Sequence, residues 1–193
     1  VRTQAILDLI DGPDLDDAAI KAALATAKLD ASDRHPSIET LVHALAIRLC
    51  GAAYVGHTHP VALNAVLCSR GAREALRGHL FPETALYLGP HPLIVPYADP
   101  GVPLARAVKA ELGAHLDRYG APPRVFFLLN HGLFALGATA TEVRNITAMA
   151  VKYAAVLTGT YALGGPRFMT TAEVDCICTR PDEIVRRLAA NAE

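Results

Sequence analysis

The chain has 193 residues, 52% of them hydrophobic and 19% charged, which is enough to build a sizeable core and excludes an intrinsically disordered protein. Its 18 Lys and Arg residues against 19 Asp and Glu residues leave a net charge of −1, which argues against a basic nucleic-acid-binding surface or a polybasic membrane patch. Eight histidines are the most unusual feature of the composition. They raise the question of whether these side chains are scattered or converge on one site.

The N-terminal part of the chain is predicted to be helical. Helices are expected around residues 6–10, over Ala18–Leu29 and from Ser37 to Leu49. Asp16 is a suitable N-cap for the second helix, because its carboxylate can accept a hydrogen bond from a first-turn amide. Ser37 is the expected N-cap of the third helix, which places Glu39 in the first turn, where a negative charge is favourable.

Short strands and helices alternate through the rest of the chain. Strands are predicted at 53–59, 85–88, 93–95, 125–129 and 133–136, and helices at 61–69, 103–118, 139–161 and 181–190. The last two strands are expected to pair through the Asn130-His131-Gly132 turn, and Thr139 with Glu142 fits a capping box. Because the alternation lacks a strict β-α-β rhythm, we predict an α/β sandwich with a mixed or antiparallel sheet.

Cysteine spacing and hydropathy indicate the compartment. The four cysteines lack the paired spacing of a structural zinc site, so we expect reduced thiols and a cytoplasmic location. The most apolar stretch, Ile146–Leu163, contains Lys152 together with several Thr and Gly residues and falls short of a membrane span of ~20 residues. We therefore expect neither a membrane nor a nucleic acid as partner.

The motif His57-Thr58-His59 is the sharpest local signal in the sequence. On a strand, residues i and i+2 point to the same face, so both imidazoles are expected to project together. Two histidines near a strand end supply half of a tetrahedral zinc site, with Zn–N distances of about 2.0–2.1 Å. Taken alone, the same motif also describes two polar residues at a strand end without a ligand role.

His131 and Glu39 extend this pattern. His131 follows a buried strand and precedes Gly132, a position at which a sheet presents side chains at its rim. Three histidines with an open fourth position are typical of a catalytic zinc site. Glu39 is the candidate acid or base, since a carboxylate near a divalent cation can alternate between metal ligand and proton acceptor. The alternative for Glu39 is a surface charge at a helix N-terminus.

Three separate motifs follow one another along the chain. They are Pro36-Ser37-Ile38-Glu39-Thr40 with His43, Gly56-His57-Thr58-His59-Pro60, and Asn130-His131-Gly132-Leu133 with Gly137 and Thr139-Ala140. In order and separation they resemble the class II aldolase/adducin family, whose members include L-fuculose phosphate aldolase and L-ribulose phosphate 4-epimerase. The resemblance extends from about Pro36 to Tyr161. Agreement of three motifs is far more specific than any one of them.

The resemblance implies a fold and a metal site. The chain would be a single class II aldolase/adducin-like domain over residues 1–193, a three-layer α-β-α sandwich around the central sheet. His57, His59 and His131 would hold Zn²⁺, or another divalent ion such as Mn²⁺ or Co²⁺, since imidazole accepts several metals. Glu39 would be the general acid/base and would also contact the metal when substrate is absent.

The resemblance also implies an activity. It is the reversible aldol cleavage of a ketose or ketose phosphate through a metal-stabilised enediolate. Ser37 would bind substrate, and Asn130 would support the metal ligands. His43 lies four residues after Glu39 on the same helix face, so its spacing suits it to orient that carboxylate. A packing role is the alternative for His43. Family members are typically homotetramers with sites at subunit interfaces, so we expect the same of this chain.

Two features depart from the family pattern. The family's N-terminal segment carries Gly-Asn and Ser-Gly pairs that bind phosphate, and this sequence starts after them at Val1, so we expect that segment to be missing from it. Ile38 stands where the sugar-phosphate aldolases place a second phosphate-binding serine, which leaves a non-phosphorylated or differently placed anionic substrate as an alternative. The interface tyrosine of the aldolases has no assigned counterpart, and Tyr97 is expected to be a loop aromatic.

Other functions remain open at this point. The same metal site would serve an epimerase, a dehydratase or a decarboxylase, and an adducin-like interaction module would keep the fold without catalysis. Retention of all three histidines and the glutamate favours an enzyme. The remaining histidines outside the motifs are expected on solvated surface: His35, His79, His91 and His115.

Overall fold

The computed structural model describes residues 1–191, and these form two compact units. The first unit comprises Val1–Gly51 and Ala98–Pro122, and the second comprises Ala52–Tyr97 and the chain from Pro123 onward. Each unit therefore combines segments that are distant in the sequence. That all of them belong to one domain stays a prediction.

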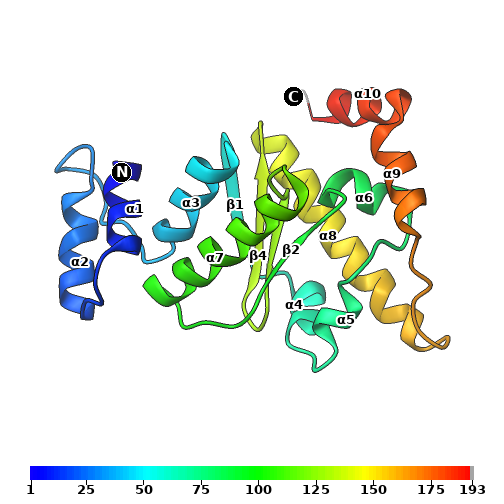
Figure 1. Ribbon diagram of the computed structural model, residues 1–193, viewed down its shortest axis with the longest axis horizontal. Coiled ribbons are helices and arrows are strands. Elements are labelled where there is room, and N and C mark those ends of the chain that lie inside the picture. Colours follow the sequence, from blue (N-terminus) through cyan, green and yellow to red (C-terminus); the bar gives the residue numbers. More distant parts are fainter. Residues whose placement is uncertain (192–193) are drawn as a thin grey trace. The chain divides into compact units, whose positions relative to one another are not determined.

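The first unit is helical. Its helices are α1 (Thr3–Asp11), α2 (Asp17–Thr26), α3 (Thr40–Cys50) and α7 (Val102–Tyr119), labelled in Figure 1. Helices α1, α3 and α7 contact one another, and Ile6, Leu45 and Leu112 on them are fully buried. Asp16 accepts a hydrogen bond from Ala19 N at 2.8 Å, which confirms the predicted N-cap of the second helix.

The second unit is built on a four-stranded mixed sheet. Its strands are β1 (Tyr54–Thr58), β2 (Leu93–Val95), β3 (Val125–Leu128) and β4 (Gly132–Gly137), in the order β1-β4-β3-β2. Strand β4 is antiparallel to both β1 and β3, whereas β2 is parallel to β3. The predicted α/β class, the mixed sheet and the hairpin through residues 130–132 are confirmed.

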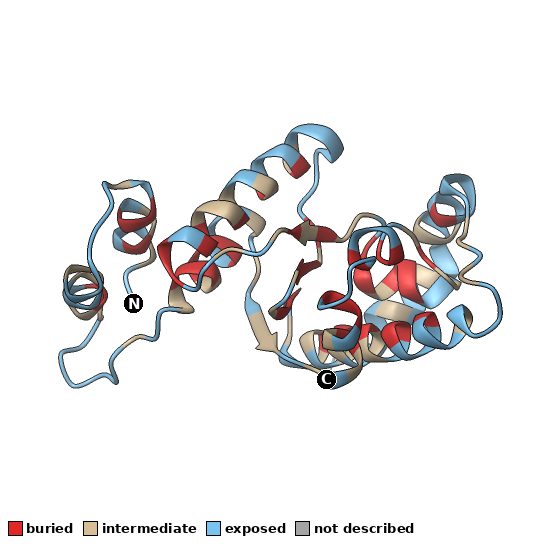
Figure 2. Cartoon of the chain, turned by 90° about the horizontal axis from the view of Figure 1, so that it is seen from below, coloured by how far each residue is buried: buried red, intermediate tan, exposed pale blue. Residues whose placement is uncertain are grey.

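Helices complete the second unit. They are α4 (Val61–Leu67), α5 (Ala72–Ala75), α6 (Pro82–Leu88), α8 (Ala140–Tyr161), α9 (Thr171–Thr179) and α10 (Pro181–Ala190). The long helix α8 contacts β1, β4, α4 and α6. Phe127, Leu133 and Tyr153 belong to the resulting hydrophobic core. Figure 2 shows the buried residues concentrated on the inner strands β3 and β4, on β2 and on one side of the helices, as the hydrophobic effect requires, whereas β1 is half-buried.

Residues 85–88 are helical, so the prediction of a strand there is wrong. They form the C-terminal part of α6, which has Pro82 in its first turn and ends before Gly89. Proline in the first turn has its φ angle already set for a helix, and Glu83 beside it complements the helix dipole. A short apolar run cannot be assigned to strand or helix by periodicity alone. The prediction also lacks α9, although Thr170 caps it.

Helix α3 begins later than predicted. Glu39 is its N-cap residue rather than a first-turn residue, and its side chain makes no capping hydrogen bond. Ser37 does not cap the helix either. Its main-chain oxygen accepts from Thr40 N at 3.1 Å and so closes a turn that precedes the helix. The turn uses two residues that the prediction had assigned to the helix.

Only half of the capping box predicted at the start of α8 forms. Thr139 accepts a hydrogen bond from Glu142 N at 3.0 Å, as predicted. The carboxylate of Glu142 binds Ala138 N at 2.7 Å and pairs with the Arg124 guanidinium, instead of binding the main chain of Thr139. A buried carboxylate is stabilised by an ion pair, and the nearby arginine comes from a distant part of the sequence.

Of the four histidines predicted to lie on solvated surface, His35 is exposed, His91 is half-buried, and His79 and His115 are only 3% and 7% exposed. The prediction is therefore wrong for the last two. Both ring nitrogens of His79 have partners, the Thr84 hydroxyl at 3.2 Å and Pro90 O at 3.1 Å. Hydrogen bonds of this kind allow a polar ring to be buried without water. His115 lies on the buried face of α7.

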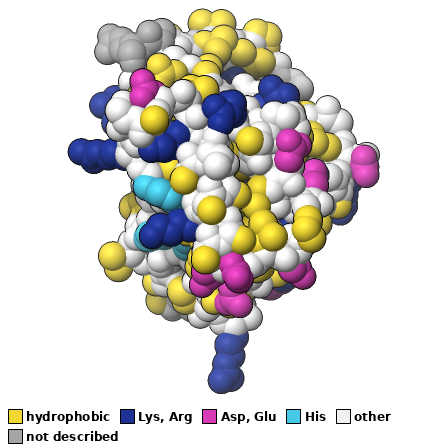
Figure 3. Space-filling model, turned by 90° about the vertical axis from the view of Figure 1, so that its left-hand side faces the viewer, with side chains coloured by type: hydrophobic (Ala, Val, Ile, Leu, Met, Phe, Trp, Pro, Cys, Tyr) yellow, Lys and Arg dark blue, Asp and Glu magenta, His cyan; other side chains and the backbone are white. Residues whose placement is uncertain are grey.

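The surface is mixed in charge. Figure 3 shows acidic, basic and hydrophobic side chains interspersed over the described part of one face, in agreement with the near-zero net charge. Within residues 1–191, none of the helices combines the length and the hydropathy that crossing a bilayer requires.

The burial of His79 predicts a pH dependence of stability. Burial lowers the pKa of His79 below its ordinary value of 6.5, against the opposing effect of the hydrogen bond to Pro90 O. The unfolded chain therefore binds a proton first, and the free energy of unfolding should fall as the pH drops from about 7.5 to about 5.5. Denaturant titrations in the presence of a chelator measure this fall. His79→Gln should flatten it, whereas His35→Gln should not; equal slopes in the two variants would contradict the assignment.

Candidate metal centre

Three histidines gather at one end of the sheet. Among residues 1–191, His57, His59 and His131 form a cluster in which one ring nitrogen of each lies within 4.8 Å of the others. His57 and His131 are half-buried and His59 is exposed. The sequence-based expectation that these side chains meet is therefore met by the structure, within the second unit alone.

His57 is held by its strand neighbours. In the antiparallel pairing of β1 with β4 it lies opposite Phe134, and the two rings stack with their centroids 4.1 Å apart. Its Nδ1 lies 3.0 Å from Leu133 O. Because a carbonyl oxygen only accepts hydrogen bonds, Nδ1 carries the proton and donates. In the neutral form of such a ring, Nε2 has a lone pair, and here this atom faces His59.

His59 lies one residue beyond the end of β1, immediately before Pro60, which is the N-cap of α4. Its Nε2 lies 3.0 Å from the Nε2 of His57. The space for this ring depends on Gly132, since a Cβ atom there would lie 2.4 Å from His59 Cδ2 and 2.7 Å from Thr58 O. A side chain at position 132 would therefore displace the imidazole or the strand.

His131 lies in the turn between β3 and β4. Asn130 before it has φ of 58°, the left-handed region that asparagine tolerates better than most residues. The turn is closed by a hydrogen bond from His131 N to Leu128 O at 3.1 Å. The ring of His131 lies 5.0 Å from that of His57 and 5.1 Å from that of His59, measured between centroids.

The donor set fits a divalent transition metal. Three neutral imidazoles are ligands that zinc and its neighbours accept. The Nε2 atoms of His57 and His59, 3.0 Å apart, are close enough to bind one ion about 2.0–2.1 Å from each. The hydrogen bond from His57 Nδ1 to a main-chain carbonyl is typical of metal-binding histidines, because it fixes the tautomer and the ring orientation. Three protein ligands leave a position for substrate.

The other predicted site residues are divided between the two units. Glu39, His43 and Ser37 belong to the first unit, so their roles stay predictions. Glu39 is half-buried and Ser37 is exposed. Burial lowers the pKa of His43, and the charge of Glu39 one helical turn away opposes this effect. Asn130, predicted to support the site, is exposed and contributes the turn conformation described above.

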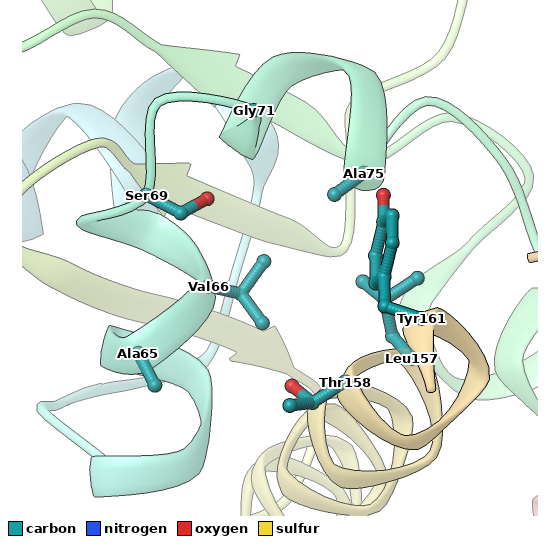
Figure 4. A pocket seen from close by; sticks show the side chains of 8 residues that line it. All are labelled: Ala65, Val66, Ser69, Gly71, Ala75, Leu157, Thr158 and Tyr161. Atoms are coloured by element: carbon teal, nitrogen blue, oxygen red, sulfur yellow. The ribbon is translucent and has the colours of Figure 1, made fainter. Parts of the chain in front are cut away.

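A separate cavity of about 330 Å³ lies beside α4, α5 and the end of α8. Figure 4 shows its lining: Ala65, Val66, Ser69, Gly71, Ala75, Leu157, Thr158 and Tyr161. None of these eight residues is a metal-binding histidine or a carboxylate. The cavity is therefore distinct from the histidine cluster.

Sequence reasoning missed two supporting features of the cluster. The carbonyl of Leu133 and the ring of Phe134 both contact His57, yet their strand shows only an apolar run. The register of β1 against β4, which no local pattern specifies, decides which residue lies opposite His57. The close approach at Gly132 could have been predicted, because glycine in a turn is typical of positions where another group approaches the main chain.

A family-wide sequence profile, that of the Class II Aldolase and Adducin N-terminal domain, matches residues 12–158. A comparison with curated protein sequences finds no match. Among solved structures, an L-fuculose 1-phosphate aldolase is similar with a TM-score of 0.60 and 18% identity, over 76% of this chain and 64% of its own. The N-terminal class II aldolase domain of a conserved Thermoplasma acidophilum protein is similar with a TM-score of 0.59 and 23% identity, over 81% of this chain and 64% of its own.

YgbL from Klebsiella pneumoniae, provisionally described as an aldolase/epimerase/decarboxylase, has a TM-score of 0.57 and 25% identity, over 80% of this chain and 78% of its own. The chain spans less than two thirds of the length of the fuculose phosphate aldolase and of the Thermoplasma protein. These likenesses show the fold.

The close approach of Gly132 to His59 predicts a large effect of a small substitution. Gly132→Ala places a methyl group against the backbone oxygen of Thr58, which cannot rotate away, so we expect a loss of about 1–3 kcal/mol in the free energy of unfolding. Gly113→Ala, within α7 and with no atom within 4 Å of the added group, should instead stabilise by about 0.5–1 kcal/mol. Denaturant titration measures both; similar effects would refute the steric argument.

Proposed function

The chain belongs to the class II aldolase and adducin family, and from this premise we propose that it is a divalent-metal-dependent aldolase. The resemblance found in three sequence motifs is thereby confirmed for the family. The proposed reaction is the reversible cleavage of a ketose or ketose phosphate into an aldehyde and a smaller ketone. The proposed metal is Zn²⁺, with Mn²⁺ or Co²⁺ as alternatives that the same imidazole set accepts.

The single observation that carries this proposal is the convergence of His57, His59 and His131 within 4.8 Å. The three side chains come from a strand end and a hairpin turn. The His57 ring donates to Leu133 O, and the main chain of His131 accepts from the Asn64 side chain. A cation bound there would supply positive charge that polarises a substrate carbonyl and stabilises negative charge as an enediolate forms. An adducin-like interaction module has no need of such a cluster.

We assign the proton transfers to Glu39. In the cleavage direction its carboxylate takes the proton from the hydroxyl on the carbon beyond the bond that breaks. The electron pair of that O–H bond forms the aldehyde carbonyl, and the electrons of the broken carbon–carbon bond remain on the enediolate. Protonation of the enediolate carbon by the same carboxyl group then completes the ketone product and restores the carboxylate. Ser37 is proposed to bind substrate, while His43 and Asn130 support the site.

The remaining features of the proposal follow from the family. A homotetramer with sites at subunit interfaces, a single domain, a cytoplasmic location and a small sugar or sugar phosphate as substrate all belong to it. An epimerase, dehydratase or decarboxylase would use the same metal and the same carboxylate. Product analysis with ketoses, ketose phosphates and β-hydroxy acids separates these reactions, because only an aldolase releases an aldehyde from the first two classes.

Removal of a histidine from the cluster should abolish metal binding. We expect purified protein to retain zinc in an equimolar amount, and His57→Ala and His131→Ala to lose most of it, because a site with two imidazoles binds far more weakly than one with three. Elemental analysis after dialysis measures the content. His35→Ala, which changes an exposed histidine outside the cluster, should retain zinc. Full zinc in the first two variants would rule out the site.

Substitution of Glu39 should separate catalysis from metal binding. Glu39→Gln keeps the shape of the side chain but removes its basicity, so we expect turnover to fall by about 10²–10⁴-fold while zinc content is kept. Aldehyde release from the best substrate of the panel measures turnover. Glu83→Gln, which changes an exposed carboxylate on α6, is the matched control. Unaltered turnover in Glu39→Gln would exclude its proposed role.

A further inference from the structure

Helix α4 joins the two parts of the histidine cluster. It begins at Val61, two residues after His59, and ends at Leu67. Its last carbonyl, Leu67 O, accepts a hydrogen bond from Asn130 N at 3.2 Å. In its middle, Asn64 donates from Nδ2 to His131 O at 3.0 Å. The turn that carries His131 is therefore attached to the helix that starts directly after the other two histidines.

The orientation of the Asn64 amide is fixed by its partner. A main-chain carbonyl only accepts, so the Nδ2 side of the amide must face His131 O. The Oδ1 atom on the other side is buried and has no hydrogen-bond partner among the described residues. Leaving a buried amide oxygen unsatisfied is unfavourable. Overall stability alone would therefore be served as well by a leucine, the residue that α4 has at 63 and 67.

We infer that Asn64 is a positioning residue of the metal centre, which rests on the proposed metal site at the three histidines. Its hydrogen bond holds the main chain of His131 at the carbonyl, while the bond from His131 N to Leu128 O holds it at the amide. With both ends of the residue fixed, the Cα–Cβ bond has one direction, from which the ring reaches the cluster, its centroid 5.0 Å from that of His57 and 5.1 Å from that of His59.

The left-handed conformation of Asn130 makes this restraint necessary. A residue other than glycine with positive φ is of higher energy than the alternatives, so the turn tends to relax unless other contacts hold it. Two bonds to α4 supply those contacts, one from Asn130 N and one to His131 O. Without the second, His131 can rotate away from the cluster while the strands remain paired.

Loss of the Asn64 hydrogen bond should weaken metal binding and leave the stability of the fold unchanged. Supporting hydrogen bonds around metal ligands typically contribute 10–100-fold to metal affinity. Asn64→Leu keeps the volume of the side chain and removes the donor, so we expect zinc affinity to fall by that factor. The matched control is Asn145→Leu, since Asn145 on α8 also donates to a main-chain carbonyl, Ala190 O at 3.1 Å, with no link to the histidines.

The experiment measures zinc affinity by competition with a chelating indicator, the visible absorption of the Co²⁺-substituted proteins, and thermal unfolding in chelator. Asn64→Leu should bind zinc 10–100-fold more weakly and show an altered Co²⁺ spectrum, because the position of one imidazole changes. Its unfolding temperature in chelator should not lie below that of Asn145→Leu. The control should keep the affinity and spectrum of the unaltered chain.

Two outcomes would overturn the inference. One is unchanged affinity and spectrum in Asn64→Leu while His131→Ala loses zinc, which leaves the metal site in place and removes the role of Asn64. The other is an Asn64→Leu protein that loses affinity only because it unfolds in chelator at a temperature well below the control. A chain that binds no zinc before any substitution refutes the proposed site itself, so the two failures are distinguishable.

Discussion

The antiparallel pairing of β1 with β4 is the constraint on which the histidine cluster depends. It sets His57 opposite Phe134 and places the end of β1 beside the turn that precedes β4. Side chains alternate along a strand, so a slip of one residue would turn His57 to the opposite face. That face is closed, because a Cβ atom at Gly56 would lie 2.5 Å from Val143 Cγ1 on α8. Packing against α8 therefore excludes the shifted register.

Histidine has two different roles in this chain, and the partners of the ring nitrogens distinguish them. One hydroxyl, of Thr84, and one carbonyl, of Pro90, engage the two nitrogens of His79, so its buried ring links α6 to the loop after it. The Nδ1 atom of His57 donates to Leu133 O, and its Nε2 lies 3.0 Å from the Nε2 of His59. A sequence shows the same residue type in both cases. Each ring has one main-chain acceptor, so the partner of the other nitrogen distinguishes the two histidines: a hydroxyl for His79 and a second imidazole for His57.

The features that depend on neighbouring residues in the sequence, such as strand alternation and turns, could be predicted from the sequence. Alternation placed His57 and His59 on one side of a strand, and the turn residues after β3 predicted the hairpin that carries His131. The failures arise where a distant segment decides. Residues 85–88 are apolar in either conformation, and it is Pro82 with the contacts of α6 to α8 that makes them helical. The pairing of Glu142 with Arg124 and the bond from Asn64 to His131 O depend on partners 18 and 67 residues away, and His79 is buried against Pro90 O in the loop after α6.

The arrangement of the three histidines also indicates whether folding of the chain would depend on metal binding. The three imidazoles come from two chain segments, and main-chain hydrogen bonds of the sheet already hold these segments together. Helix α4 adds a hydrogen bond from Asn64 to the turn that carries His131. In small zinc domains the unfolded chain has no such frame, and metal binding supplies the folding free energy. In this chain a core of buried residues from the strands and α8 supplies the folding free energy. A metal ion would add stability that grows with the logarithm of its affinity for the folded chain, as any ligand does. At the proposed metal site, the quality of the histidine geometry would set the metal affinity, and Asn64 would act on that affinity through His131 O. The close approach of Gly132 to Thr58 O bears on the stability of the fold as well.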